Sequence, residues 1–176
     1  HNVENYMAAF AAVRGLVSAE TMDAVARSFH GVEHRIERIR VRRGVRWYND
    51  SIASSPSRTI AGLRSFPEKV ILIAGGKDKG ISYDAIGPEI NEHVKYLILC
   101  GATAGVIRES VQKAANYAGL PIREVQDYHE AVALADEVSG EGDVVILSPA
   151  STSFDRFANF MERGRVFKDI VNALPD

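Results

Sequence analysis

Polar residues that could bind an anionic ligand follow a strand pattern in the segment 47–58. The chain leaves an apolar, β-branched stretch and reaches a helix-forming stretch, 59–66, through Asn49, Asp50, Ser51, Ser54 and Ser55. In open α/β sheets, ligands bind at the carboxyl ends of the strands, and free N–H groups at a helix start attract anions. The simpler alternative is that Ser54 or Ser55 only caps the helix, ahead of Pro56 near its first position.

Two further apolar segments end in residues of the same chemical kind. The segment 70–74 (VILIA) breaks into GGKDKG at 75–80, and the segment 144–147 (VVIL) breaks into SPASTSFD at 148–155. Because the carboxyl ends of parallel strands meet at one edge of a sheet, the three strand ends together predict one polar crevice.

The chemistry of these two segments favours binding over nucleophilic attack. GGKDKG allows a tight turn but lacks the closing Gly-Lys-Ser/Thr of a P-loop. Lys79 is a point charge suited to a carboxylate, although a solvated turn would look the same. No GxSxG motif surrounds the serines of 148–153, so we expect their hydroxyl and N–H groups to bind a carboxylate or phosphate at a helix start. No Cys/His spacing indicates a metal site.

The composition fits one well-buried core with a small appendage. The chain has 176 residues, of which 46% are hydrophobic, and a net charge of −2, which requires neither a nucleic acid nor an acidic membrane surface as partner. No apolar run approaches the roughly 18 residues of a membrane span. Cys100 is the only cysteine, so no intrachain disulfide can form, and a reducing cytoplasm fits best.

From residue 34 the hydrophobic pattern changes to alternation. Residues 38–42 alternate, and Gly44 turns the chain into 45–48, which predicts a hairpin with one solvated face. Strands are then expected near 69–74, 94–100, 122–125 and 143–147, and helices near 56–66, 84–92, 104–118, 128–139 and 157–173. This alternation predicts an α/β domain with a mainly parallel sheet covered on both faces by helices.

The first thirty residues have a different pattern. They predict two helices joined around Gly15, with the second beginning at Ser18, and 31–33 has the character of a linker. Two helices alone cannot bury their apolar faces, and the chain does not begin with methionine. We therefore interpret it as a piece of a longer protein.

Six arginines are concentrated around the predicted hairpin: Arg35, Arg38, Arg40, Arg42, Arg43 and Arg46. We interpret those from Arg38 to Arg46 as the solvated face of an edge hairpin, where charge opposes edge-to-edge pairing. No aromatic stacking platform accompanies them, which argues against nucleic-acid binding. Arg35 lies just before the strand and could reach a phosphate with its planar guanidinium.

These motifs, in this order, resemble the C-terminal part of the Mur ligases, the amide-forming ligases of bacterial peptidoglycan synthesis. The matching segments are HNVEN (1–5), HRIE (34–37), WYNDS (47–51), GGKDKG (75–80) and SPASTSFD (148–155), followed by Phe157, Asn159-Phe160 and Arg163-Gly164. The resemblance covers essentially the whole chain. Within the family it is greatest to the members that add D-glutamate to UDP-N-acetylmuramoyl-L-alanine.

The resemblance implies a domain organisation and a reaction. Residues 1–33 would be the last helices of the central ATPase domain plus a linker, and 34–176 the C-terminal, Rossmann-like three-layer domain. The family activates a carboxylate as an acyl phosphate with ATP and Mg²⁺, and an amine then attacks. The P-loop, the metal ligands and the catalytic residues would lie outside this chain, which we expect to be inactive alone and monomeric.

The resemblance also assigns roles to single residues. Asn2 and Asn5 match positions beside the ATP base, Arg35 a position towards the phosphates, and Asp50 a position towards the ribose. The pocket for the D-glutamate carboxylates is matched by Lys79, Ser54, Ser153, Phe154 and Phe160.

Two residues depart from the family pattern, and two alternatives stay open. Ile52 replaces a common lysine, which removes one charge from the crevice, and Ser151 stands where many relatives have cysteine. The first alternative is another Mur or folylpolyglutamate-type ligase, although the Asp-Asn-Pro-Arg motif expected for diaminopimelate addition is missing. The second is a non-catalytic nucleotide-binding module.

Overall fold

The computed structural model describes residues 2–29 and 31–176, and the chain divides into two compact units between Val32 and Glu33. The first unit holds α1 (Asn2–Ala12) and α2 (Ala19–Ser28). Ser18 caps α2, since its hydroxyl accepts a hydrogen bond from Thr21 N at 3.3 Å. The two helices and the start at Ser18 agree with the sequence prediction. None of the described side chains up to Val32 is buried.

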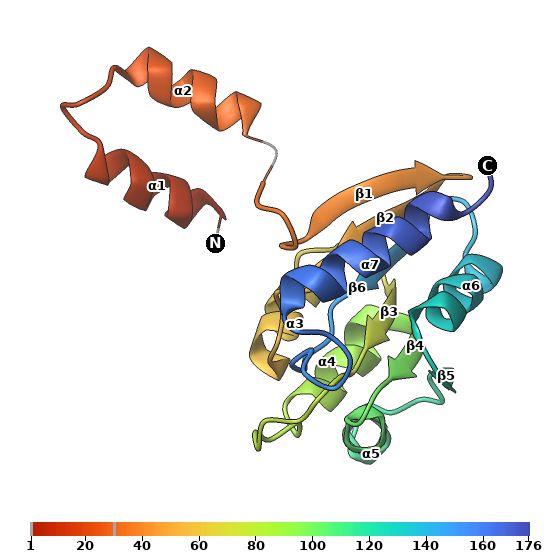
Figure 1. Ribbon diagram of the computed structural model, residues 1–176. Helices are drawn as coiled ribbons and strands as arrows, with labels where there is room; N and C mark the ends of the chain where they lie inside the picture. Colours follow the sequence, from red (N-terminus) through yellow and green to blue (C-terminus); the bar gives the residue numbers. More distant parts are fainter. Residues whose placement is uncertain (1, 30) are drawn as a thin grey trace. The chain divides into compact units, whose positions relative to one another are not determined.

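The second unit is built on one six-stranded sheet with the order β1-β2-β6-β3-β4-β5 (Figure 1). The strands are β1 (Glu37–Arg42), β2 (Val45–Asn49), β3 (Val70–Ala74), β4 (Val94–Cys100), β5 (Ile122–Val125) and β6 (Val144–Leu147). Only β1 and β2 pair antiparallel, as the expected hairpin; the other pairs are parallel. β6 lies between β2 and β3, so the last strand of the chain joins the hairpin to the rest of the sheet.

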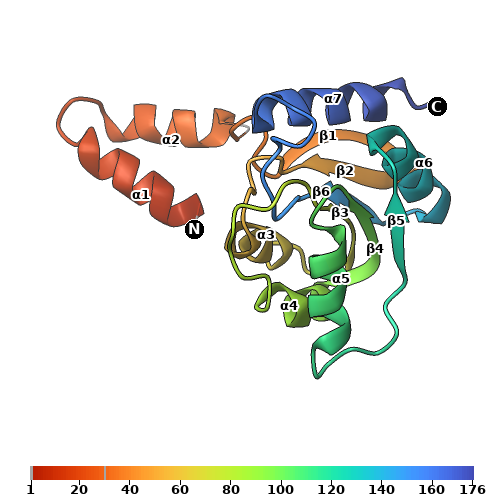
Figure 2. The same cartoon turned by 60° about the horizontal axis from the view of Figure 1, so that its bottom comes forward.

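Helices cover both faces of this sheet. Figure 2 shows α6 and α7 on one side and α3, α4 and α5 on the other. Their bounds are α3 (Pro56–Leu63), α4 (Ile86–His93), α5 (Ala104–Lys113), α6 (Tyr128–Val138) and α7 (Phe160–Ala173). The predicted α/β, three-layer domain with a mainly parallel sheet, preceded by a short helical segment, is therefore confirmed.

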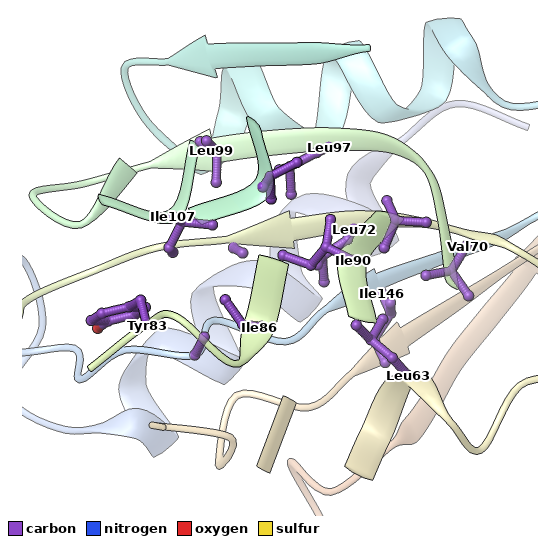
Figure 3. Packing of buried hydrophobic residues seen from close by; sticks show 14 of the residues in the cluster. Leu63, Val70, Leu72, Tyr83, Ile86, Ile90, Leu97, Leu99, Ile107 and Ile146 are labelled. Atoms are coloured by element: carbon purple, nitrogen blue, oxygen red, sulfur yellow. The ribbon is translucent and has the colours of Figure 1, made fainter. Parts of the chain in front are cut away.

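The central strands are apolar throughout because both of their faces are covered. Alternate residues of each strand enter two different cores: Leu72 and Ile146 pack with Leu63, Ile86 and Ile90 (Figure 3), whereas the neighbouring residues of the strands pack against α6 and α7. This double burial fixes the register of the strands and hence the height at which each one ends.

The structure corrects the expected start of the last helix. α7 begins at Phe160, where Asn159 Oδ1 accepts from Glu162 N at 2.9 Å. The segment SPASTSFD therefore forms a loop that ends before the helix, and its serines do not lie at a helix start. α5 ends at Lys113, earlier than the residue 118 expected from its pattern.

The structure also corrects the expectation that the arginines of the hairpin, Arg38 to Arg46, form a solvated face. Arg38 and Arg43 are exposed, but Arg42 is buried and paired with Asp136. Arg40 Nη1 donates to the carbonyl oxygens at the end of α7, those of Val171 (3.2 Å), Asn172 (3.1 Å) and Leu174 (3.1 Å). A helix end leaves such carbonyls without partners. Arg40 of β1 thus satisfies carbonyl groups at the C-terminal end of α7.

We expect limited proteolysis to cut the chain between residues 29 and 34 and to leave a stable product that begins there. The first unit has no buried described side chain, whereas 70–147 contains the central strands. Mass spectrometry of the fragments over time checks this. Cuts within 70–147 at a comparable rate would contradict the expectation.

Candidate functional site

The loops after β2, β3 and β6 leave the same edge of the sheet, and hydrogen bonds join the last two. Gly75 N donates to Pro149 O at 2.8 Å. Lys77 and Thr152 exchange two backbone hydrogen bonds, of 2.9 and 3.1 Å, as an isolated antiparallel bridge. At two of the three strand ends where the sequence predicts a crevice, the backbone is therefore fixed, over 75–77 and 149–152.

Gly76 permits this close approach of the two loops. Its φ is 154°, and a Cβ at this position would lie 2.3 Å from Thr152 O. Gly76 N also donates to Thr103 Oγ1 at 3.1 Å, so the loop after β4 is joined to the loops after β3 and β6. A side chain at residue 76 would force the β3 and β6 loops apart.

A chain of buried hydroxyl groups connects the loops at this edge of the sheet. Ser151 Oγ is 2.9 Å from Tyr83 OH and 2.8 Å from Thr103 Oγ1. Because Thr103 also bonds Gly76, these hydroxyls connect the loops after β3, β4 and β6. Ser151 is a structural member of this network, and its hydroxyl is enclosed.

Arg163, in α7, reaches the same place from the opposite face of the sheet. It is 1% exposed. Its Nε donates to Ser51 Oγ (3.0 Å), Nη2 to Ser51 O (2.9 Å) and Nη1 to Ser151 O (3.0 Å). Ser51 Oγ in turn donates to Phe160 O at 2.7 Å. One guanidinium therefore joins the loop after β2 to the loop after β6.

Asp50 is the buried carboxyl of the site. It is 4% exposed, and its oxygens accept from Ile36 N (3.2 Å) and Ser148 Oγ (2.8 Å). Burial raises the pKa of Asp50 to about 6, because two hydrogen bonds and the more distant Arg35 and Arg58 offset only part of the desolvation of the charged form. A buried carboxyl whose ionised form is destabilised by desolvation is common at functional positions.

Asn49 and His34 form a second buried pair. Ser51 N donates to Asn49 Oδ1 at 3.1 Å, so Asn49 Nδ2 is the donor towards His34 Nδ1, 2.9 Å away. The neutral ring then carries its proton on Nε2, and burial lowers the pKa of His34, which favours this neutral form. A Cβ on Gly164 would lie 2.3 Å from His34 Nδ1, which explains the glycine in α7.

Glu33, His34 and Glu37 are close enough to suggest a metal site, with ligand atoms within 4.8 Å of one another. Lys168 Nζ, however, already donates to Glu33 Oε1 (3.0 Å) and Glu37 Oε1 (2.6 Å). In the neutral form of His34, Nε2 carries the hydrogen and therefore offers no lone pair to a metal. The cluster fits the ammonium of Lys168 better than a metal ion.

The residues matched to a D-glutamate pocket lie on the loops just described and on the first turn of α7. Ser153 is buried, Ser54 and Phe160 are half-buried, and Lys79 and Phe154 are exposed, Phe154 by 62%. The Lys77–Thr152 bridge brings the loop that carries Lys79 beside the loop that carries Ser153.

The residues matched to an ATP site belong to both units of the chain. Arg35 is exposed and lies in the turn that leads from His34, which has a φ of 66°, to Ile36, whose N–H binds Asp50. Asn5 is exposed on α1 in the other unit. The side chain of Asn2 lies outside the described residues.

Sequence reasoning missed the groups that hold the loops together. Arg163 was noted only as part of an Arg-Gly pair, and nothing in the sequence around Thr103 or Tyr83 marks them as hydrogen-bond partners of Ser151. The glycine that follows Arg163 indicates a close neighbour of the helix, which is His34, but it does not mark the arginine as buried.

A family model described as "Mur ligase, glutamate ligase domain" matches residues 34–151. The chain belongs to the Mur ligase family. It is 55% identical to the UDP-N-acetylmuramoylalanine–D-glutamate ligase of Acetivibrio thermocellus over 99% of this chain and 38% of that protein. It is 54% identical to the enzyme of the same name from Ruminiclostridium cellulolyticum, with the same coverage. The family resemblance predicted from the motifs is thus confirmed.

Solved structures show the same fold at low sequence identity. The MurF ligase of Thermotoga maritima, in complex with ADP, superposes with a TM-score of 0.55 at 18% identity over 93% of this chain and 36% of that one. A folylpolyglutamate synthase/dihydrofolate synthase of Yersinia pestis gives a TM-score of 0.62 at 17% identity over 88% and 34%. This Mur ligase chain spans 38% of the length of the curated relatives named above.

We expect Asp50→Asn to stabilise the folded state at pH 7.5 by about 1–3 kcal/mol. Because the folded-state pKa of Asp50 is raised, its ionisation destabilises the fold as the pH rises through about 6. The gain in free energy of unfolding of the variant over the wild type should be full above pH 6. It should shrink as the pH falls towards 4, where wild-type Asp50 is protonated in the folded state. Urea unfolding at several pH values measures it.

Asp169→Asn removes an exposed carboxylate and is the matched control, with an expected change below about 0.5 kcal/mol at every pH. A destabilised Asp50→Asn variant at pH 7.5, or an advantage independent of pH, would show that the charge of Asp50 carries no net cost.

Proposed function

We propose that this chain is the C-terminal part of an ATP-dependent ligase that adds D-glutamate to UDP-N-acetylmuramoyl-L-alanine in peptidoglycan synthesis. The observation that carries the proposal is 55% identity, over 99% of this chain, to an enzyme named for D-glutamate ligation. In this proposal residues 1–33 end the central ATPase domain and 34–176 are the C-terminal domain. The enzyme acts as a cytoplasmic monomer.

The crevice is proposed to bind the two carboxylates of D-glutamate. The ammonium of Lys79 supplies charge from the loop after β3, and the hydroxyls of Ser54 and Ser153 supply donors from the loops after β2 and β6. Phe154 and Phe160 provide apolar surface for the methylene groups. The fixed contacts between 75–77 and 149–152 support this assignment, because a preorganised backbone lowers the entropy cost of binding.

ATP is proposed to bind with Arg35 near its phosphates, with Asp50 towards the ribose and with Asn2 and Asn5 beside the base. Arg35 fits a phosphate, since its guanidinium is exposed. Asp50 fits the ribose less directly, because it is only 4% exposed and each of its oxygens already accepts a hydrogen bond within the domain. Mg²⁺ would be held by residues outside this chain.

In the proposed mechanism ATP supplies the phosphoryl group that activates the substrate carboxylate. The loops after β2, β3 and β6 hold D-glutamate by its carboxylates, which leaves its amine free to point out of the crevice. A movement at the linker 31–33 would bring that amine to the activated carboxylate and exclude water from it. The chain's own contribution is orientation and desolvation of the amine donor.

The second candidate is a ligase of the same fold with another amino-acid substrate. Structural neighbours include a folylpolyglutamate synthase, but at 17% identity this likeness shows the fold alone. Amino-acid-dependent phosphate release by the full-length enzyme separates the candidates. Activity with D-glutamate supports our proposal, and activity only with another amino acid contradicts it.

We expect Lys79→Ala in the full-length enzyme to raise the KM for D-glutamate by about 10- to 150-fold. Losing a hydrogen bond to a charged group costs roughly 1.5–3 kcal/mol. The KM for ATP should change little, because ATP is proposed to lie near Arg35. Lys79→Arg should restore activity only in part, since a guanidinium is larger and planar.

Lys77→Ala is the internal control for Lys79→Ala. The Lys77 side chain is exposed, and its backbone rather than its ammonium forms the bridge to Thr152. A rise in the KM for ATP alone after Lys79→Ala would show that the two ligands are assigned to the wrong places.

We also expect the isolated chain to show no ATP turnover, because its sequence contains no P-loop motif to hold the phosphates. Phosphate release by the purified chain should equal that of a buffer blank, with and without D-glutamate. Turnover clearly above the blank, retained after a second purification step, would be evidence against the proposed domain assignment.

A further inference from the structure

Arg163 has an unusual electrostatic environment. Among the residues that the structure describes, it is the one buried lysine or arginine with no carboxylate within salt-bridge distance. Its guanidinium donates three hydrogen bonds to uncharged oxygens of Ser51 and Ser151. A guanidinium keeps its charge even when buried, so the desolvated cation is only partly compensated.

The contacts of Arg163 lead to every element that carries a proposed D-glutamate ligand. Ser51 precedes Ser54 on the loop after β2, and Ser151 precedes Ser153 on the loop after β6. The Ser51 hydroxyl also holds Phe160 O at the start of α7. On the remaining loop, a Cβ added to Gly76 would lie 3.2 Å from Arg163 Nη1, so the guanidinium also packs against the turn that leads to Lys79.

A neutral residue could not provide both the hydrogen-bond geometry and the buried positive charge of Arg163. Two peptide carbonyls and a hydroxyl from different loops are held by one planar group with fixed donor directions, which a lysine or an amide cannot reproduce. The positive charge is buried below loops proposed to receive a dicarboxylate, and in a medium of low dielectric its attraction for anions is weakly screened. Asp155 is the nearby carboxylate, but it is exposed on the loop.

We propose that Arg163 is a positioning residue for the amino-acid substrate. It fixes the loops after β2, β3 and β6 relative to one another and supplies the buried positive charge beneath the dicarboxylate site. The inference rests on the proposed function, because it takes D-glutamate as the ligand of these loops.

The experiment uses steady-state kinetics of the full-length enzyme with Arg163→Met and Arg163→Lys. We expect Arg163→Met to raise the KM for D-glutamate by about 10- to 100-fold, while the KM values for ATP and the UDP-linked substrate change by less than about 3-fold. Arg163→Lys restores the charge without the planar geometry, so its KM should lie between those of Arg163→Met and the wild type.

Ser51→Ala is the second variant, in case Arg163→Met does not fold. It removes one acceptor of the guanidinium and the link to Phe160 O but keeps the charge, and we expect a rise of about 3- to 10-fold in the KM for D-glutamate. Arg165→Met is the matched control. Arg165 is exposed on the same helix, two residues further on, and its replacement should leave all three KM values unchanged.

Three results would overturn the proposal: an unchanged KM for D-glutamate in folded Arg163→Met or Ser51→Ala, an equal rise in all three KM values, or an Arg163→Lys variant no better than Arg163→Met. An Arg163→Lys variant no better than Arg163→Met would show that the positive charge does not contribute to D-glutamate binding. Failure of the proposed function would be seen earlier and separately, as wild-type enzyme whose phosphate release does not depend on D-glutamate.

Discussion

The position of β6 in the sheet determines the rest of this structure. β6 forms parallel hydrogen bonds to β2 on one side and to β3 on the other, so β2 and β3 meet only through it. The loops that follow these three strands consequently leave one edge next to one another. Because connections diverge to either side at this point, these loops lie where open α/β sheets bind ligands. The chemistry proposed for the chain follows from this arrangement of strands.

The site combines a firm backbone with polar groups that are costly to bury. Hydrogen bonds that involve Gly76, Thr152 and Ser151 fix the loops, and the buried groups beside them include a cation, Arg163, and a carboxyl, Asp50. Neither of these two is paired with an opposite charge within salt-bridge distance among the described residues, so each reduces the stability of the fold. Sites that bind charged ligands commonly carry such costs, and a carboxylate ligand would supply the missing partner of Arg163.

Much of the fold could be predicted from the sequence because it depends on local patterns. The apolar runs of β3, β4 and β6 and the cap at Ser18 are determined by neighbouring residues. The clustering of the three loops also followed, from the general rule that parallel strands end on one edge. The order of the strands, the C-terminal end of α5 and the start of α7 did not, since they depend on contacts between distant segments.

The arginines illustrate the same limit more sharply. Arg40 and Arg42 have the charge and spacing of a solvated strand face, but the carbonyls at the end of α7 and the carboxylate of Asp136 come from residues far along the chain. Arg163 is the converse case, since its helix reads as amphipathic while its partners lie on other elements. Buried polar contacts of this kind have no local sequence signature, so side chains that join distant loops are the part of the site that a sequence hides.

The central place of β6 also has a consequence for how the chain can fold as it is made. The hairpin β1–β2 emerges early, yet its partner begins only at Val144, after β3, β4 and β5 have been completed. Until then β2 and β3 each present an unpaired, largely apolar edge, the kind of surface that invites wrong association. Contacts of such large sequence separation also slow folding. The domain therefore completes its sheet late in synthesis, and the loops after β2, β3 and β6 become neighbours only in that final step.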